Sequence, residues 1–94
     1  MPYILVRHKS EDFARWKPVY DGHAATRKAA GCKGARLFRS STNPSETIVL
    51  LEWDDLNKAR QFAQSPDLRE TMKRAGVVGQ PDIYFLEEVE HTGA

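Results

Sequence analysis

Residues Trp16–Arg27 read W-K-P-V-Y-D-G-H-A-A-T-R, and they combine a helical apolar periodicity with polar, reactive side chains. The periodicity begins at Phe13 and places Tyr20, His23 and Arg27 on or beside the apolar face. Their spacing of i, i+3 and i+7 puts all three on one side of a helix. We therefore expect an aromatic helix that covers a sheet and turns these polar groups towards it.

This helix is expected to run from about residue 11 to residue 30, with Ser10 as its N-cap. Pro18 lies inside it and removes one backbone hydrogen bond. We favour a kinked, nearly continuous helix; the alternative is a short first turn that ends near Lys17, with the main helix starting at Pro18. Gly31 can supply the left-handed residue that ends the helix.

Four segments rich in β-branched and aromatic residues are expected to be strands. They are Tyr3–His8, Ala35–Ser40, Thr47–Trp53 and Asp82–Val89.

A second helical region is expected between the last two strands, in two pieces. Asp54 or Asp55 caps the first piece, and Ser65-Pro66-Asp67 starts the second with an N-cap, a proline and an acid. Gly76 ends this helix, and residues 77–81 are expected to form a connecting loop. The order β-α-β-β-α-β predicts a ferredoxin-like α+β fold, with a four-stranded antiparallel sheet, helices on one face, and residues 1–94 as a single domain.

The central strand is apolar on both faces, with Ile48 and Leu50 on one and Val49, Leu51 and Trp53 on the other. Helices on one side would cover only one of these sets. An uncovered apolar sheet face on a small protein indicates an interface. We therefore expect a homodimer that packs sheet on sheet around a two-fold axis, without deciding which set faces the helices.

Composition excludes several classes of protein. Fourteen basic and thirteen acidic residues in 94 leave no basic surplus for nucleic acid, and no apolar run is long enough for a membrane span. Cys32 stands alone, so an internal disulfide or cysteine-based zinc site is not expected, and we interpret it as structural. His8, His23 and His91 are too scattered to suggest a metal site. We expect a cytoplasmic protein without a signal peptide.

The chain resembles the dimeric α/β-barrel superfamily, most closely its antibiotic-biosynthesis-monooxygenase and stress-responsive barrel types. The resemblance rests on the opening strand, F-A-R-W-K-P-V-Y-D-G-H at 13–23, L-L-E-W-D-D at 50–55 and S-P-D-L-R-E-T-M-K-R-A-G-V at 65–77. It implies a pocket between the helices and the sheet of each subunit.

The superfamily includes cofactor-free monooxygenases of polycyclic aromatic or quinol substrates, heme-degrading enzymes, dismutase-like and dehalogenase-like members, and proteins with no known reaction. Heme-degrading members use an Asn on the first strand, a His on the first helix and a Trp. This chain has His23 and Trp53 but no Asn on its first strand.

Tyr20, His23 and Arg27 are the candidate catalytic residues. Together they could donate to, or take a proton from, a small acidic or phenolic ligand. Alternatively, Arg27 extends its charge to solvent or pairs with Glu52 or Glu87, and His23 is a hydrogen-bonded edge histidine.

The candidate substrate-binding residues are aromatic, although core packing is the simpler interpretation for any single one. They are Trp16, Trp53, Phe38 and Phe62. His8 could be a second acid–base group, but a solvated histidine at a strand end is the simpler interpretation.

Two functions fit these residues. The first is a cofactor-independent monooxygenase, with dioxygen as co-substrate and no metal or flavin. In it, His23 acts as base or steers a substrate hydroxyl, while Tyr20 and Arg27 stabilise negative charge. The second is a non-catalytic or stress-related dimeric protein that binds a small apolar acid at Arg27. The sequence does not decide whether the protein is an enzyme.

Overall fold

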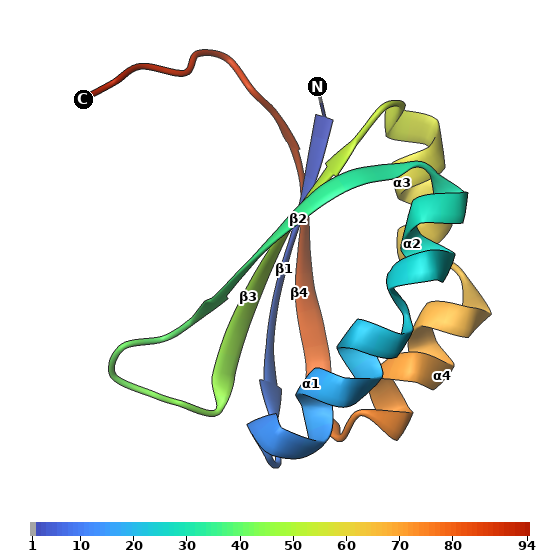
Figure 1. Cartoon of the computed structure of the whole chain (residues 1–94), viewed down its shortest axis with the longest axis vertical. Helices are drawn as coiled ribbons and strands as arrows, with labels where there is room; N and C mark the ends of the chain where they lie inside the picture. Colours follow the sequence, from blue (N-terminus) through green and yellow to red (C-terminus); the bar gives the residue numbers. More distant parts are fainter. Residues whose placement is uncertain (1) are drawn as a thin grey trace.

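The computed structural model describes residues 2–94 and shows one antiparallel sheet of four strands in the order β2-β3-β1-β4 (Figure 1). The strands are β1 (Pro2–Ser10), β2 (Cys32–Arg39), β3 (Glu46–Trp53) and β4 (Val77–Glu87).

Four helices lie on one face of this sheet and leave the other face bare (Figure 1). They are α1 (Phe13–Gly22), α2 (Ala24–Ala30), α3 (Leu56–Ala63) and α4 (Pro66–Arg74). The chain therefore has the predicted ferredoxin-like α+β fold, with each helical region divided into two helices.

Burial alternates along the two central strands because successive side chains point to opposite faces. On β3 the buried set is Val49, Leu51 and Trp53 together with Thr47, so this set faces the helices. The register continues the same face onto β1, where Val6 pairs with Val49. The core is thus built from the helix-facing sides of β1 and β3.

The opposite face of the sheet carries Leu5, Ile48 and Leu50, which are only half-buried, and the more exposed Phe38 and Tyr84. The register explains the set, because Leu5 lies opposite both Leu50 and Tyr84. The sequence left open which apolar set faces outward, and the structure places Ile48 and Leu50 there.

The first helical region is distorted as expected, but the predictions of a kink at Pro18 and of an N-cap at Ser10 are wrong. Asp12, not Ser10, is the N-cap, and its carboxylate accepts from the Ala14 amide at 3.0 Å. The helix passes through Pro18 and breaks at His23, whose φ of −89° and ψ of −1° separate α1 from α2. Ser10 is instead the last residue of β1, where its backbone N–H donates to the Ser45 carbonyl.

The expected loop at residues 77–81 is also wrong, because β4 already begins at Val77, which pairs with Ser10. A register shift between Arg7 and Lys9 of β1 marks an irregularity in this ladder, and Gly79 takes a left-handed φ of 70° beside it. Since β4 is an edge strand, Pro81 can lie in it without breaking a ladder on both sides.

The local signals at the other helix ends are confirmed. Asp55 caps α3 and Ser65 caps α4, with the Ser65 hydroxyl accepting from the Leu68 amide at 3.2 Å. Gly31 ends α2 with a left-handed φ of 116°, where glycine is favoured because it has no Cβ.

Candidate functional site

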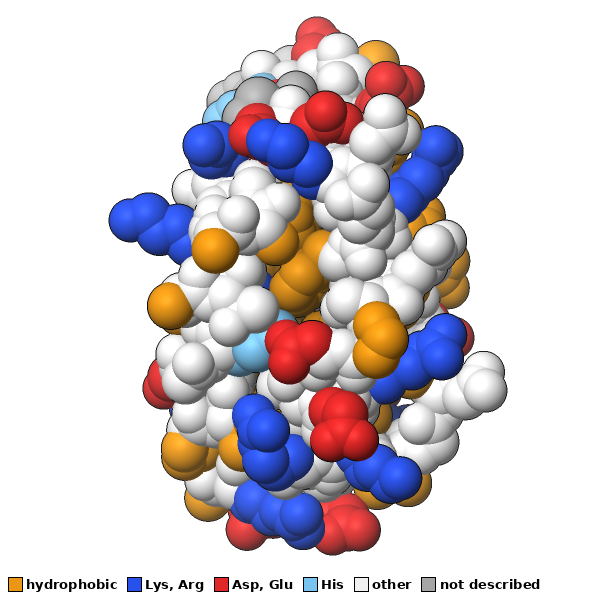
Figure 2. All heavy atoms as spheres, turned by 90° about the vertical axis from the view of Figure 1, so that its right-hand side faces the viewer, with side chains coloured by type: hydrophobic (Ala, Val, Ile, Leu, Met, Phe, Trp, Pro, Cys, Tyr) orange, Lys and Arg blue, Asp and Glu red, His pale blue; other side chains and the backbone are white. Residues whose placement is uncertain are grey.

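A cavity of about 60 Å³ lies between the helices and the sheet, near the middle of β1 and β3. On the outer surface, apolar side chains are visible in a hollow between two columns of helices (Figure 2). The cavity is lined mainly by apolar side chains, and its polar lining residues lie on four elements and in the α1–α2 break. They are His8, Tyr20, His23, Arg27 and Thr71.

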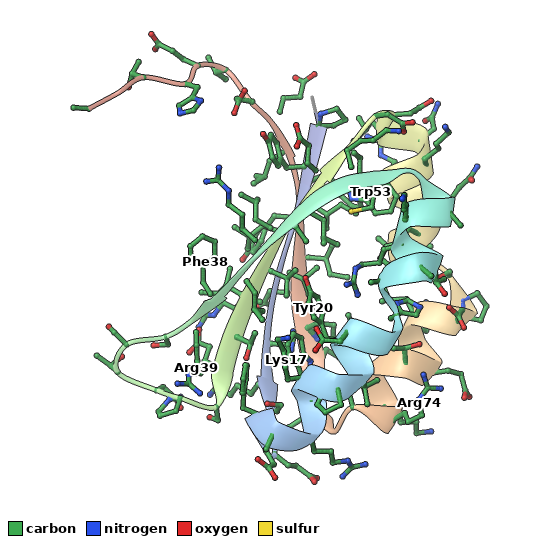
Figure 3. The ribbon with its side chains drawn as sticks, viewed as in Figure 1. Lys17, Tyr20, Phe38, Arg39, Trp53 and Arg74 are labelled. Carbon is green, nitrogen blue, oxygen red and sulfur yellow. The ribbon has the colours of Figure 1, made fainter. Side chains whose placement is uncertain are left out.

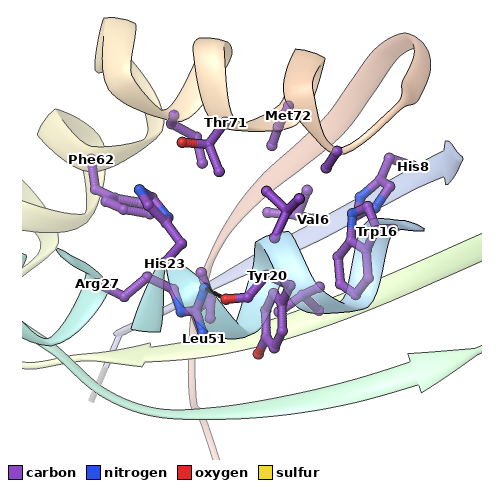
Figure 4. Close-up of a pocket in the computed structure, with 14 residues that line it drawn as sticks. Val6, His8, Trp16, Tyr20, His23, Arg27, Leu51, Phe62, Thr71 and Met72 are labelled. Carbon is purple, nitrogen blue, oxygen red and sulfur yellow. Dashed lines mark hydrogen bonds between the residues drawn. The ribbon is translucent and has the colours of Figure 1, made fainter. Parts of the chain in front are cut away.

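The two histidines lie at opposite ends of the cavity (Figure 4). His8 and Trp16 are at one end, His23 and Arg27 are at the other, and Tyr20 and Thr71 lie between them. Apolar side chains fill the rest of the lining between the two ends.

Arg27 is a buried cation, with only 8% of its surface exposed. Its Nη1 donates to the Tyr20 carbonyl at 2.9 Å, and its guanidinium carbon lies 4.0 Å from the centre of the Tyr20 ring. Within residues 2–94, no carboxylate oxygen lies within 4.0 Å of the guanidinium nitrogens of Arg27. Because a buried charge is normally paired, this arrangement favours an anion in the cavity.

The alternative in which Arg27 pairs with Glu52 or Glu87 is therefore wrong. Glu52 lies on the outer face of the sheet, where it pairs in register with Tyr3. Glu87 is the last residue of β4. Neither glutamate forms an ion pair with Arg27 among the described residues, so the Tyr20 backbone and ring are the contacts left to Arg27.

His23 forms a pair with an acid from a distant helix. It lies in the break between α1 and α2 with 7% exposure, and its Nε2–H donates to Asp67 Oδ2 at 2.8 Å. Asp67 belongs to the first turn of α4 and its side chain is 66% exposed. The pair joins the two helical regions at the rim of the cavity and fixes the orientation of the imidazole.

His8 is not the solvated histidine that the sequence suggested. Only 5% of its surface is exposed, and neither ring nitrogen has a hydrogen-bond partner among the described residues. Its ring centroid lies 5.1 Å from that of Trp16. The reason is strand alternation: His8 follows Ile4 and Val6 on the helix-facing side of β1.

The four aromatic candidates divide into two groups. Trp16 and Phe62 line the cavity. Trp53 is fully buried behind the cavity wall, with its ring centroid 5.0 Å from that of Phe62. Phe38 is 49% exposed and points away from the helices (Figure 3), because its neighbour Leu37 takes the inward position on β2.

Burial changes the acidity of two further groups. It raises the pKa of Tyr20, and the charge of Arg27 opposes the rise. The Tyr20 hydroxyl therefore stays protonated near neutral pH and can donate a hydrogen bond. Burial also raises the pKa of the Cys32 thiol, which donates to the Gly34 carbonyl at 3.3 Å, so Cys32 is not a thiolate nucleophile.

The burial of His8 and the pairing of His23 with Asp67 were not predicted from the sequence. The alternation of Ile4, Val6 and His8 could have revealed the burial of His8. Asp67 looked only like an acid in the first turn of a helix, and no local pattern connects it to a residue 44 positions earlier.

The described residues contain no group of three or more side chains placed to hold a metal ion. No helix among them is long and apolar enough to cross a membrane. The site therefore consists of an apolar cavity, a buried arginine and two imidazoles.

Comparison with known proteins agrees with this fold. The sequence profile described as antibiotic biosynthesis monooxygenase matches residues 3–74. A structure from Bordetella bronchiseptica, assigned to the antibiotic biosynthesis monooxygenases, has a TM-score of 0.81 at 19% identity and covers 95% of this chain and 97% of its own. A comparison with curated proteins finds no significant match.

Two further structures share the fold. SnoaB of Streptomyces nogalater, described as a cofactor-independent oxygenase, has a TM-score of 0.80 at 13% identity, covering 99% of this chain and 97% of its own. A Caulobacter crescentus structure assigned to the antibiotic biosynthesis monooxygenases has a TM-score of 0.75 at 22% identity, covering 95% and 90%. The chain thus has a ferredoxin-like fold with a helix-covered cavity. It belongs to the antibiotic biosynthesis monooxygenase family.

Proposed function

We propose that this chain is a cofactor-independent monooxygenase whose substrate is a small aromatic compound carrying an acidic or phenolic group. The observation that carries the proposal is the buried Arg27, which lines an apolar cavity without a carboxylate partner in the described part of the chain. An anionic group on the ligand would neutralise it, and Trp16 and Phe62 would pack against the ring.

The polar groups near Arg27 have separate tasks. Arg27 and the Tyr20 hydroxyl stabilise negative charge on the substrate. His23 steers the adjacent polar group, because Asp67 holds its Nε2–H and thereby fixes the ring. These tasks need the cavity closed to water, which the burial of Arg27 and His23 favours.

The chemistry balances without an added reductant. When a phenol becomes a quinone, its ring C–H and its C–OH both become carbonyls, and the substrate supplies four electrons to dioxygen. One oxygen atom then forms the new C=O bond, and the other leaves as water with the ring hydrogen and the hydroxyl hydrogen. The protein's part is to bind the substrate, promote loss of its proton and exclude bulk water.

The substrate has to open the cavity in order to enter. Apolar cavities that hold a benzene ring measure about 150 Å³, and this one measures about 60 Å³. The hollow between the helix columns (Figure 2) gives the direction of entry. Separating α2 from α4 breaks the contact between His23 and Asp67, which is partly open to water and therefore weak.

We also propose that two copies of the chain pack through the bare face of the sheet. This face carries exposed Phe38 and Tyr84 beside half-buried Leu50. Burying such a patch against a second copy is favourable at about 25 cal/mol per Å² of apolar surface. Light scattering at micromolar concentration tests this, and a mass of one 10.7 kDa chain would contradict it.

Oxygen uptake with a panel of quinols and hydroxylated aromatic acids tests the activity. Arg27→Met should reduce uptake strongly, while Lys28→Met should not, because Lys28 is an exposed cation on the same helix. Uptake that is unchanged in Arg27→Met, or absent from the wild-type protein with every substrate, would contradict the proposal.

The bond of His23 to Asp67 favours a second candidate function, binding without turnover, because it occupies one nitrogen of that imidazole. A ligand that raises the melting temperature and is recovered unchanged, with no oxygen consumed, would identify a binding protein. Arg27 would then anchor the ligand's acid, with His23 beside it.

A further inference from the structure

His8 lies beside Trp16 at the end of the cavity opposite Arg27 (Figure 4). Only 5% of its surface is exposed, and neither Nδ1 nor Nε2 has a hydrogen-bond partner in the described part of the chain. Buried polar atoms in native proteins are nearly always hydrogen-bonded, so two open nitrogens in one ring need an explanation. A ligand in the cavity would supply the missing partner.

The surroundings of His8 hold its ring but leave its nitrogens free. Trp16 packs against the ring from α1, while Val6 and Val49 line the adjoining sheet surface. Thr47 lies opposite His8 in the strand register and is also buried, yet no hydrogen bond joins the two side chains. The ring is thus held by packing, it lines the cavity, and neither nitrogen is bonded to another described residue.

Burial lowers the pKa of His8 below its ordinary value of 6.5. The imidazole is therefore neutral near pH 7, with one nitrogen carrying a proton and the other free to accept one. His23 differs, because its Nε2–H already serves Asp67. The two histidines of the cavity are consequently suited to different tasks.

We propose that His8 is the catalytic base of this site, and that the substrate is a hydroxylated aromatic acid whose acidic group lies on Arg27 and whose reacting hydroxyl lies on His8. The inference rests on the proposed function and adds to it the substrate class and the proton acceptor. Once the cavity has opened, the apolar side chains between Arg27 and His8 can pack against the ring.

The step is a single proton transfer. The substrate O–H bond breaks, its electron pair stays on oxygen, and the proton forms an N–H bond on His8. The products are a phenolate and an imidazolium, which stabilise each other in a site of low polarity. The phenolate is richer in electrons than the phenol, as reaction with dioxygen requires. Proton transfer back to solvent follows when the product leaves and water reaches His8.

Calorimetry with a matched pair of ligands tests the inference. Para-hydroxybenzoic acid carries both groups at opposite ends of the ring, while its methyl ether lacks the hydroxyl proton. We expect the wild-type protein to bind the hydroxy acid about tenfold more tightly, as one hydrogen bond in a buried site predicts. His8→Phe should abolish this preference. Arg27→Met should weaken the binding of both ligands by the same factor.

His8→Gln separates hydrogen bonding from proton transfer. Glutamine can accept a hydrogen bond from the substrate hydroxyl but cannot take its proton, so the tenfold preference should be kept while oxygen uptake with a hydroxylated aromatic acid is lost. Uptake at the wild-type rate in His8→Gln would overturn the role of His8 as base.

The outcomes distinguish the two proposals. The inference about His8 fails if the dissociation constants of the hydroxy acid and its ether differ by the same factor in the wild-type protein and in His8→Phe. The proposed function still stands in that case, provided that Arg27→Met weakens the binding of both ligands. If neither acid binds, or Arg27→Met has no effect, both fail. Imidazole ¹⁵N spectra of the wild-type protein need no variant: the His8 signals should move with the hydroxy acid and not with the ether, and unmoved signals overturn the inference.

Discussion

Replacing His8 by Phe should stabilise the protein, although it removes a residue of the site. Each buried polar group without a partner costs about 1–3 kcal/mol, and His8 has two such nitrogens. Phenylalanine keeps an aromatic ring against Trp16, and the neighbouring cavity of about 60 Å³ can take its extra volume. Allowing for some overpacking, we expect a gain of about 1–2 kcal/mol in the free energy of unfolding.

Thermal unfolding at one fixed protein concentration measures this gain, and about 4–8 °C per kcal/mol is expected for a chain of this length. The gain should also grow as pH falls. Because burial lowers the pKa of His8 below 6.5, the unfolded chain binds a proton more readily, so the wild-type protein loses stability below about pH 6.5 and His8→Phe escapes that loss. A melting temperature that falls in His8→Phe would refute the reasoning, since it would show that His8 has a structural role.

Three further changes test other parts of the structure. Gly31→Ala should cost about 1–3 kcal/mol, because φ is 116° and the new Cβ would lie 2.9 Å from Lys58 Cδ, whereas Gly22→Ala, with no atom within 4 Å of its Cβ, should be nearly neutral in the same melting assay. Asp67→Asn should change the free energy of unfolding in urea by less than about 1 kcal/mol, because the Asp67 side chain of the pair is exposed to solvent. The same change should reduce substrate oxidation, because it releases the His23 ring. Leu50→Glu should yield monomers in light scattering, and an unchanged mass would exclude the bare sheet face as the interface.

The architecture could be predicted because its signals are local. Asp55 and Ser65 each accept from amides of the helix that they start. Gly31 and Gly76 both adopt positive φ, as predicted for residues that end helices. Alternation along β3 likewise identified the two apolar sets, although only the packed structure shows that the helices cover Val49 rather than Ile48.

The errors arose where tertiary contacts override local signals. Gly79 and Pro81 are typical of a loop, but pairing of β4 with β1 carries the strand through both. Pro18 was the expected point of distortion in the first helical region. The break falls at His23 instead, where the buried imidazole reaches Asp67 on α4.

In the site, too, the positions set by local spacing could be predicted and the tertiary contacts could not. The spacing of Tyr20, His23 and Arg27 predicted that they share a face, and all three line one cavity. Their partners were not predictable, because the Tyr20 carbonyl and Asp67 are brought to them by the helix break and by packing between distant helices. His8 was underestimated because a strand end suggests solvent, whereas α1 covers this end of β1 through Trp16.

We propose that the cavity joining Arg27 to His8 is the ligand site. Titration of ¹⁵N-labelled protein with para-hydroxybenzoic acid can locate the ligand, because every backbone amide and imidazole reports at once. We expect the largest shifts at His8, Tyr20 and Arg27, with few on the bare face of the sheet. Shifts confined to that bare face or to the groove between α4 and β4, with the signals of Arg27 and His8 unmoved, would contradict it.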